Sequence, residues 1–381
     1  MASPKRIKVE KPVKLIFVGG FLGSGKTTAL AGLARRLVQK NRRVGIITND
    51  QTENLVDTVI VREMLSELGV PVEEVVKGCF CCRFDELINE MEKILAHDPD
   101  VLMGEPVGSC TDFVAAVANP IKIHYKDAFK FAPFSTMVDP DRVRELLLEE
   151  TPTTFPEEVS YLFKKQLEEA DIIALNKIDS ISQQETERLV SLINKAYPEK
   201  TVTTVSAREG EGMDDWLEDL LSGRPGANTV LRQIDYDRYA AAEAVLGWLN
   251  AAIMLNAKDS FEATEFSRRL ALRLQEAFKE KNAGIGHLKF LITSGGKTMW
   301  TNVTNLSAEP LMSGEPLGSL SKGTLVLNAR VRLEPEDLER MVKQILGRLF
   351  EEMNIRSEEV DFQCFSPAYP EPPYLVRDTV E

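Results

Sequence analysis

The segment VGGFLGSGKTTAL, which runs from Val18 to Leu30, constrains this chain more than any other. It follows the apolar run VKLIF and leads into an amphipathic stretch, so a strand, a glycine-rich loop and a helix are expected in succession. Gly20, Gly25, Lys26 and Thr27 satisfy G-x-x-x-x-G-K-[ST], a pattern in which loop N–H groups surround phosphates at a helix N-terminus. Lys26 is expected to reach the β- and γ-phosphates, and the Thr27 hydroxyl to bind Mg²⁺. A glycine-rich turn that merely matches is the alternative, but the context favours a nucleoside triphosphate site. The predicted phosphate-binding residues are Gly20, Gly23, Ser24, Gly25, Lys26, Thr27 and Thr28.

The region from residue 13 to about 222 alternates between short apolar runs and amphipathic segments. The expected strands are VKLIFVGG, RVGIITND, PDVLMGEP, FKFAPFSTMVD, DIIALNK and TVTTVSA, and the expected helices are TTALAGLARRLVQK, FDELINEMEKILA, PDRVRELLLEE and QQETERLVSLINKAY. Such alternation predicts an α/β fold with a mainly parallel sheet covered on both faces, here a P-loop NTPase. The segment SGRPGANT breaks the pattern, which places the end of the first domain (13–222) here.

The remaining residues predict a smaller C-terminal α+β domain over 231–381. Two helical stretches are expected at 239–255 and 263–281, followed by antiparallel strands near 286–296, 297–305 and 324–333. A further helix is expected over 334–353, where acidic residues suit its N-terminus. The proline-rich tail SPAYPEPPYLV is expected to extend over the surface.

Composition excludes several classes of function. The 381 residues suffice for about two domains. A net charge of −13 argues against broad binding to nucleic acid or anionic membranes. No apolar stretch approaches a membrane span or a signal peptide, so a cytoplasmic protein is expected. The five cysteines are an odd number and three of them crowd into CFCC, which favours a metal or redox site over a disulfide framework.

The segment ALNKIDS indicates which base is bound. Asn176, Lys177 and Asp179 resemble the N-K-x-D loop with which GTPases recognise guanine. One carboxylate accepts two hydrogen bonds from the N1–H and N2–H₂ edge of guanine, whereas adenine would leave it unpaired at a cost of about 1–3 kcal/mol or more. Ser206 and Ala207 resemble the S-A-K base-contact loop, with Arg in place of Lys. The alternative, a strand end capped by Asn and Asp, is weaker behind a phosphate loop, so GTP is the expected ligand.

The segment VVKGCFCCRFDEL predicts a metal site at Cys79, Cys81 and Cys82. Crowded thiolates repel one another, so a soft cation such as Zn²⁺ would stabilise them. Three sulfurs leave a fourth coordination position open, which suits a transported or exchangeable metal. Small buried residues and a redox pair remain the alternatives.

The motifs GGFLGSGKTT, GCFCC, an E-x-x-G segment in MGEPVGS, and NKID, in that order, resemble the CobW/HypB/UreG class of metallochaperone GTPases. The resemblance covers about residues 13–222 and is greatest to the CobW-like branch, whose mark is G-C-x-C-C. It implies that GTP binding and hydrolysis control the capture or delivery of Zn²⁺, Co²⁺ or Ni²⁺, or the maturation of a metalloenzyme. The implied partners are GTP, a divalent transition metal and a client metalloprotein or cofactor-dependent enzyme.

The resemblance also implies roles for single residues. Glu105 would act in the Mg²⁺ shell or through water, and the Gly108 N–H would sense the γ-phosphate, so Lys26, Glu105 and Gly108 are the candidate catalytic residues. The N-E…D pattern of switch I is similar to Asn49, Asp50 and Asp57, with Asp50 replacing the family's Glu. Asp57 is the candidate for Mg²⁺ binding, the alternative being a solvated loop carboxylate.

Cys110 follows Gly108 by two residues, which suggests a conditional fourth metal ligand whose distance depends on the nucleotide. The alternative is a small buried residue. The chain departs from the family in having no His-rich metal-storage tract, and none of its histidines, His97, His124 and His287, is expected to be a ligand. The C-terminal domain is expected to select the client, and a homodimer stays open.

Three functions compete at this point. A GTP-driven metallochaperone or metalloenzyme activator is favoured. A regulatory GTPase with CFCC as a redox sensor is the second, and a small-molecule phosphotransferase, which the guanine loop disfavours, is the third. Slow hydrolysis is expected because no residue of the sequence is recognisable as an arginine finger.

Overall fold

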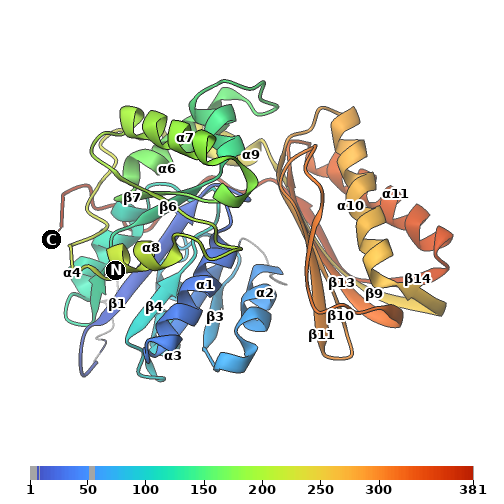
Figure 1. The fold of residues 1–381 in the computed structure, drawn as a ribbon, viewed down its shortest axis with the longest axis horizontal. Helices are drawn as coiled ribbons and strands as arrows, with labels where there is room; N and C mark the ends of the chain where they lie inside the picture. Colours follow the sequence, from blue (N-terminus) through green and yellow to red (C-terminus); the bar gives the residue numbers. More distant parts are fainter. Residues whose placement is uncertain (1–6, 8, 51–55, 381) are drawn as a thin grey trace.

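The computed structural model of the chain describes residues 7, 9–50 and 56–380. Two bodies stand side by side, an α/β domain and an antiparallel sheet with two long helices (Figure 1). Residues 51–55, which belong to the predicted switch I, lie outside the described part.

The first sheet is entirely parallel, which confirms the predicted α/β class. Its order is β3-β2-β4-β1-β6-β7-β8, with β5 also paired to β1. The strands are β1 Val13–Gly20, β2 Val44–Asn49, β3 Val72–Val75, β4 Val101–Gly104, β5 Phe129–Phe131, β6 Ser135–Val138, β7 Ile172–Leu175 and β8 Thr201–Thr204. The single strand predicted over 129–139 is wrong: the run divides into β5 and β6 at Pro133, which has no N–H for the ladder.

Helices cover both faces of this sheet (Figure 1). They are α1 Lys26–Gln39, α2 Val56–Met64, α3 Phe84–Leu95, α4 Asn119–His124, α5 Pro140–Arg142, α6 Glu157–Glu169, α7 Gln183–Ala196, α8 Met213–Leu221 and α9 Tyr236–Ala244. The helices predicted from the sequence correspond to α1, α3, α7, and α5 with the π-helical turn Val143–Leu147. Burial explains α1: its Leu30, Leu33 and Leu37 are fully buried in one core with strand residues such as Ile16.

The second sheet is entirely antiparallel, in the order β12-β11-β10-β13-β9-β14. Its strands are β9 Gly247–Glu262, β10 Ile285–Ser294, β11 Lys297–Val303, β12 Leu311–Gly314, β13 Ser319–Val331 and β14 Ile355–Phe365. The helices α10 Ala263–Glu280 and α11 Pro335–Glu352 cover the face that points away from the α/β domain (Figure 1). The predicted C-terminal α+β domain is confirmed.

The helix predicted over 239–255 is wrong in its second half. Helix α9 ends at Ala244, and β9 begins at Gly247. Leu249, Ala251 and Ile253 pack in the core under α10 and α11, whereas Trp248 on the opposite face belongs to the core of the α/β domain. Because both faces are buried, this strand lacks the alternation by which a half-buried strand is recognised.

The chain segments on both sides of the second sheet are anchored on the first domain. Before it, Arg238 of α9 forms an ion pair with Glu157 of α6. After it, the Val376 N–H donates to the Ala115 carbonyl at 2.9 Å, and Arg377 forms an ion pair with the buried Asp112 at 2.6 Å. The tail forms neither helix nor strand, as expected. Because parts of the region 231–381 pack on the first domain, the domain limits 13–222 and 231–381 stay a prediction.

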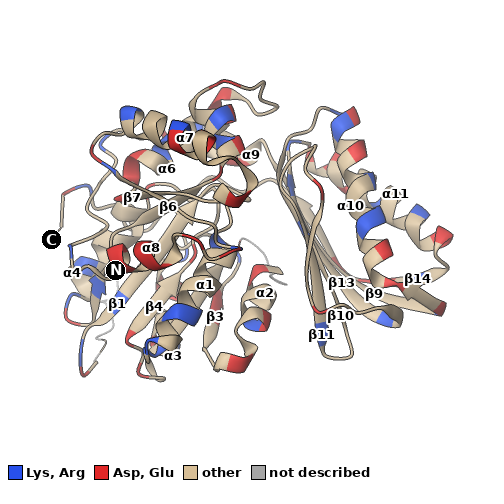
Figure 2. Cartoon of the chain, viewed as in Figure 1, with Lys and Arg blue, Asp and Glu red and all other residues tan. Residues whose placement is uncertain are grey.

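Charged residues of both signs lie along α7, α10 and α11 (Figure 2). Arg273 of α10 binds Glu352 of α11 at 2.7 Å, which joins the two outer helices. Among the described residues, no helix has the length and apolar character that crossing a membrane requires.

Candidate nucleotide and metal sites

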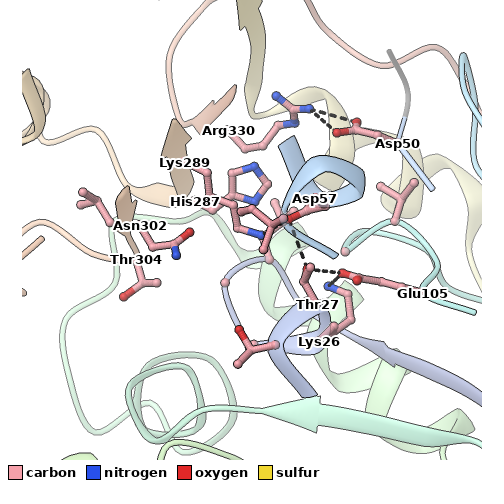
Figure 3. A pocket seen from close by; sticks show the side chains of 18 of the residues that line it. Lys26, Thr27, Asp50, Asp57, Glu105, His287, Lys289, Asn302, Thr304 and Arg330 are labelled. Carbon is pink, nitrogen blue, oxygen red and sulfur yellow. Dashed lines mark hydrogen bonds and ion pairs between the residues drawn. The ribbon is translucent and has the colours of Figure 1, made fainter. Parts of the chain in front are cut away.

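The two domains enclose a cavity of about 130 Å³. One wall comes from the phosphate loop, α2 and the loop after β4; the other comes from β10, β11 and β13 of the second sheet (Figure 3). The predicted residues Gly23, Gly25, Lys26, Thr27 and Thr28 all line it.

The phosphate loop has the backbone shape that its glycines predict. Gly20 and Gly25 have φ angles of 129° and 97°, in the region that favours glycine. A Cβ on Gly20 would lie 2.2 Å from the Met137 carbonyl oxygen, so no other residue fits there. Lys26 is buried and its Nζ donates to the Gly20 carbonyl at 2.9 Å. The Ser24 hydroxyl is buried and has no hydrogen-bond partner among the described residues.

Hard oxygen ligands gather beside this loop. The Thr27 hydroxyl lies 3.2 Å from Asp57 Oδ1 and 3.0 Å from Glu105 Oε1 (Figure 3). Glu105 Oε2 is buried without a partner in the described part of the chain. A hydroxyl and two carboxylates are the donor types that Mg²⁺ prefers, so these residues fit that ion.

The carboxyl groups differ in their charge. Burial, and then the nearby Asp57, raise the pKa of Glu105 to about 7. Burial opposes ionisation of Asp57 as well, but Lys289 lowers its pKa below the ordinary value. Burial also lowers the pKa of Lys26, against the attraction of Glu105. The site thus holds one firmly ionised carboxylate and one that is poised near neutral pH.

Gly108 packs directly on the phosphate loop. A Cβ at this position would lie 2.7 Å from Leu22 Cδ2 and 3.0 Å from Leu22 N. The Gln166 side chain of α6 donates to the Gly108 and Cys110 carbonyls, both at 3.0 Å. The Ser109 hydroxyl donates to the buried Glu243 of α9. This loop is therefore held between the nucleotide pocket and two helices.

Asn176 joins the phosphate loop to the predicted base-recognition loops. Its Nδ2 donates to the Ser24 carbonyl at 2.8 Å, and its Oδ1 accepts from the Ala207 N–H at 2.9 Å. A Cβ on Gly25 would lie 2.3 Å from this Nδ2, a second reason for a glycine there. The phosphate loop and the NKID segment lie more than 150 residues apart in sequence, and this one side-chain amide joins them.

Asp179, the predicted guanine ligand, lies beside Ser206. The Ser206 hydroxyl donates to Asp179 Oδ1 at 2.6 Å, and Arg208 approaches Asp179 Oδ2 at 2.9 Å. Lys177 adopts a left-handed conformation and its Nζ lies 3.7 Å from Asp139. The NKID loop and the loop that carries Ser206 and Arg208 thus hold the Asp179 carboxylate in one orientation.

The three cysteines of CFCC form a compact cluster at the start of α3. Their sulfurs all lie within 4.8 Å of one another, with 2.6 Å between Cys79 and Cys81 and 3.8 Å between Cys81 and Cys82. Hydrogen bonds from Cys79 and Cys81 lower the pKa of the half-buried Cys82 to about 3. The cluster thus holds a thiolate, the form that binds soft metals.

Cys110 is buried next to this cluster. Its thiol lies close enough to Cys81 for a hydrogen bond, which lowers the pKa of Cys110. Burial acts in the opposite direction, and the pKa is raised to about 11. Among the described residues, the sulfurs of Cys79, Cys81 and Cys82 all lie within 4.8 Å of one another, but the Cys110 sulfur does not belong to this group. Its role as a fourth ligand stays a prediction.

Asn49 connects the nucleotide pocket with the cysteine loop. It lines the pocket at the end of β2. Its Nδ2 donates to the Val75 and Gly78 carbonyls at 3.0 and 2.8 Å, and its Oδ1 accepts from the Phe80 N–H at 2.9 Å. A single buried side chain therefore spans the distance between the two candidate sites.

Comparison with known families decides the assignment. The model of the CobW/HypB/UreG nucleotide-binding domain matches residues 14–204. The chain belongs to this family. The match contains the phosphate loop, the cysteine cluster and the NKID segment.

Several named proteins resemble the chain in sequence. Two are named zinc chaperone CobW: the one from Sinorhizobium is 27% identical over 51% of this chain and 58% of its own length, and the one from Pseudomonas aeruginosa is 27% identical over 58% and 65%. The zinc-regulated GTPase metalloprotein activator 1 of Dictyostelium discoideum is 28% identical over 49% of this chain and 44% of its length. The chain thus spans less than two thirds of these relatives.

Among solved structures, the Zn(II)-bound YjiA GTPase from E. coli is 14% identical, with 88% of this chain and 99% of that chain covered and a TM-score of 0.37. HypB from Helicobacter pylori in complex with nickel is 18% identical, with 58% and 92% covered and a TM-score of 0.36. We draw no conclusion from likenesses of this degree.

Sequence reasoning missed the residues that the second domain of this family member adds to the pocket. His287 and Lys289 of β10 and Arg330 of β13 point at the α/β domain (Figure 3). Arg330 is fully buried and reaches Asp50 at 3.0 Å. Burial, with Lys289 and Arg330 nearby, lowers the pKa of His287 well below its ordinary value, so it is neutral. The available signal was polar residues at alternate positions of the apolar runs GHLKFL and LVLNARV.

Proposed function

We propose that this chain is a GTP-binding and GTP-hydrolysing metallochaperone or metalloenzyme activator that couples nucleotide state to metal binding at Cys79, Cys81 and Cys82. The observation that carries this proposal is Asn49, whose side chain lines the nucleotide pocket and holds the backbone of the cysteine loop. A change in β2 or switch I would be transmitted to the cysteines through the two hydrogen bonds that join Asn49 to Gly78 and Phe80.

The nucleotide half of the proposal assigns roles to particular side chains. Asp179 accepts the N1–H and N2–H₂ hydrogen bonds of guanine, oriented by Ser206. Lys26 leaves the Gly20 carbonyl to contact the β- and γ-phosphates. Mg²⁺ bound by Thr27 and Asp57 would neutralise charge on these phosphates.

Hydrolysis would depend on two residues of the loop after β4. Glu105, with its pKa of about 7, orients the attacking water and holds its proton. The Gly108 N–H reports the presence of the γ-phosphate, because this glycine already touches Leu22 of the phosphate loop.

The metal half treats Zn²⁺, or Co²⁺, as cargo. Three sulfurs within 4.8 Å supply a sulfur-rich site with one position left for a further ligand, either Cys110 or an atom of the client. The names of the zinc chaperone relatives support Zn²⁺. The proposal also includes the C-terminal domain as the module that selects a client metalloprotein, a homodimer as an open option and a cytoplasmic location.

The test is nucleotide and metal binding by the purified protein. We expect GTP to bind in preference to ATP, and about one Zn²⁺ per chain to bind at the cysteines. Equal affinity for GTP and ATP would contradict the guanine assignment. Absence of stoichiometric metal binding, with reversible oxidation of the cysteines, would favour the regulatory GTPase with a redox sensor.

A further inference from the structure

Lys289 reaches from the second domain into the oxygen cluster of the first. In β10, Leu288 and Phe290 belong to the core under α10 and α11, so Lys289 between them faces the α/β domain. Its Nζ lies 2.6 Å from Asp57 Oδ1, and both side chains are only 17% exposed. Among the described residues, Lys289 is the one ion-pair partner of Asp57, so this is a specific, buried contact between domains.

The ammonium group lies among oxygens that fit a metal ion. The same Asp57 oxygen lies 3.2 Å from the Thr27 hydroxyl, which in turn lies 3.0 Å from Glu105. These are the oxygens that fit Mg²⁺. A monovalent cation held by one of them repels a divalent cation that approaches the others, so the two cannot share Asp57.

The wall of the cavity points the same way. Part of the wall opposite the phosphate loop is the strand that carries Lys289, and the Lys289 Nζ crosses to the Asp57 oxygen on the other side. A magnesium nucleotide that uses Thr27 and Asp57 must therefore displace this contact. Departure of Lys289 from Asp57 frees the carboxylate as a ligand.

We propose that Lys289 is a tethered substitute for Mg²⁺: it keeps Asp57 and Thr27 assembled in the nucleotide-free protein and must leave when the magnesium nucleotide binds. This inference rests on the proposed nucleotide site. It makes the second domain a competitor for the metal position, so nucleotide loading and loosening of the domain contact are one event.

The first test uses Mg²⁺ alone, with the melting temperature as the readout. In Lys289→Met, Asp57 is free to bind the ion, so millimolar Mg²⁺ should raise the melting temperature, whereas the wild type should respond at least tenfold more weakly. Lys289→Gln serves the same purpose if the methionine variant does not fold. Lys289→Arg, which keeps the charge, and Lys297→Met, which removes an exposed lysine of β11, should behave as the wild type does.

The second test titrates Mg²⁺ in the presence of a fluorescent GTP analogue. The half-saturating Mg²⁺ concentration should fall about tenfold in Lys289→Met and stay constant in Lys297→Met. An unchanged Mg²⁺ dependence, or an equal loss of nucleotide affinity with and without Mg²⁺, would overturn the inference, the latter because it identifies Lys289 as a phosphate ligand. Failure of the wild type to bind GTP would contradict the proposed function instead, and the Mg²⁺-only experiment would still decide the role of Lys289.

Discussion

The Asn49 Nδ2 atom donates to the Gly78 carbonyl at 2.8 Å, one residue before the first cysteine of the cluster. The same side chain accepts from the Phe80 N–H, one residue after Cys79. Asn49 is thus attached to the backbone on both sides of Cys79 while it lines the nucleotide pocket. This arrangement would give the proposed coupling between nucleotide and metal a physical path of one residue.

Replacement of Asn49 by Ala should disconnect the two sites. The buried carbonyls and N–H that lose their partner cost about 1–3 kcal/mol each, so the cysteine loop loosens and Co²⁺ affinity falls by tenfold or more. We would follow the sulfur-to-cobalt absorption band during titration. Asn194→Ala, an exposed change on α7, is the control. Unaltered Co²⁺ affinity in Asn49→Ala would refute this path.

Two substitutions test nucleotide binding and the choice between GTP and ATP. Lys26→Ala should abolish GTP binding, and Asp179→Asn should weaken GTP by about 5- to 150-fold, because the loss of one acceptor for guanine is worth about 1–3 kcal/mol. ATP affinity should stay unchanged in the second variant. Calorimetry with both nucleotides measures this, with the exposed Lys40→Ala and Asp259→Asn as controls. Retained discrimination in Asp179→Asn would show that another group recognises the base.

The parts of the site that the sequence predicted are contiguous motifs. Gly20 to Thr28 form one loop whose shape follows from its own glycines, and CFCC brings three sulfurs together by proximity along the chain. Lys289 and Arg330 could not be predicted in the same way. They lie on separate strands of another domain, and only the packing of that sheet on α2 brings them to Asp57 and Asp50.

The secondary structure also contains elements that the sequence predicts and elements that it does not. Helix α10 has apolar residues on one face only, which gives a helical period, and it was predicted within one residue. In β9 the residues from Gly247 to Ile253 are all buried, because helices cover one face and the α/β domain the other. An apolar run without a period fits a buried helix as well as a strand, so the sequence alone gave the wrong element.

Serine at Cys79, Cys81 and Cys82 together should remove the metal site. The sulfur-to-cobalt band of the wild type should disappear, because the hydroxyl of serine is a poor ligand for a soft cation. Cys364→Ser, which changes a half-buried thiol of β14, should leave the band intact. A band that survives the triple substitution would place the metal elsewhere.

Glu169 should make the protein less stable as pH rises. Burial, and then Asp112, raise its pKa to about 8, so the native state keeps a proton that the unfolded chain releases above about pH 4.5. Its contribution is therefore complete below about pH 4.5 and declines up to about pH 8, by a few kcal/mol in total. Urea unfolding at pH 5 and pH 8 should show a smaller difference for Glu169→Gln than for the wild type or for the exposed Glu187→Gln. Equal differences in all three proteins would contradict the assignment.

The most direct test of the central claim is the Zn²⁺ affinity of one protein in two nucleotide states. We expect the GDP and non-hydrolysable GTP forms to differ about 5- to 150-fold, and Zn²⁺ to change the affinity for the GTP analogue by the same factor, since coupling is reciprocal. If Cys110 is the conditional ligand, Cys110→Ala removes the difference; if it is only buried packing, the difference persists through the other three cysteines. Identical Zn²⁺ affinity in both nucleotide states of the wild type would contradict the account.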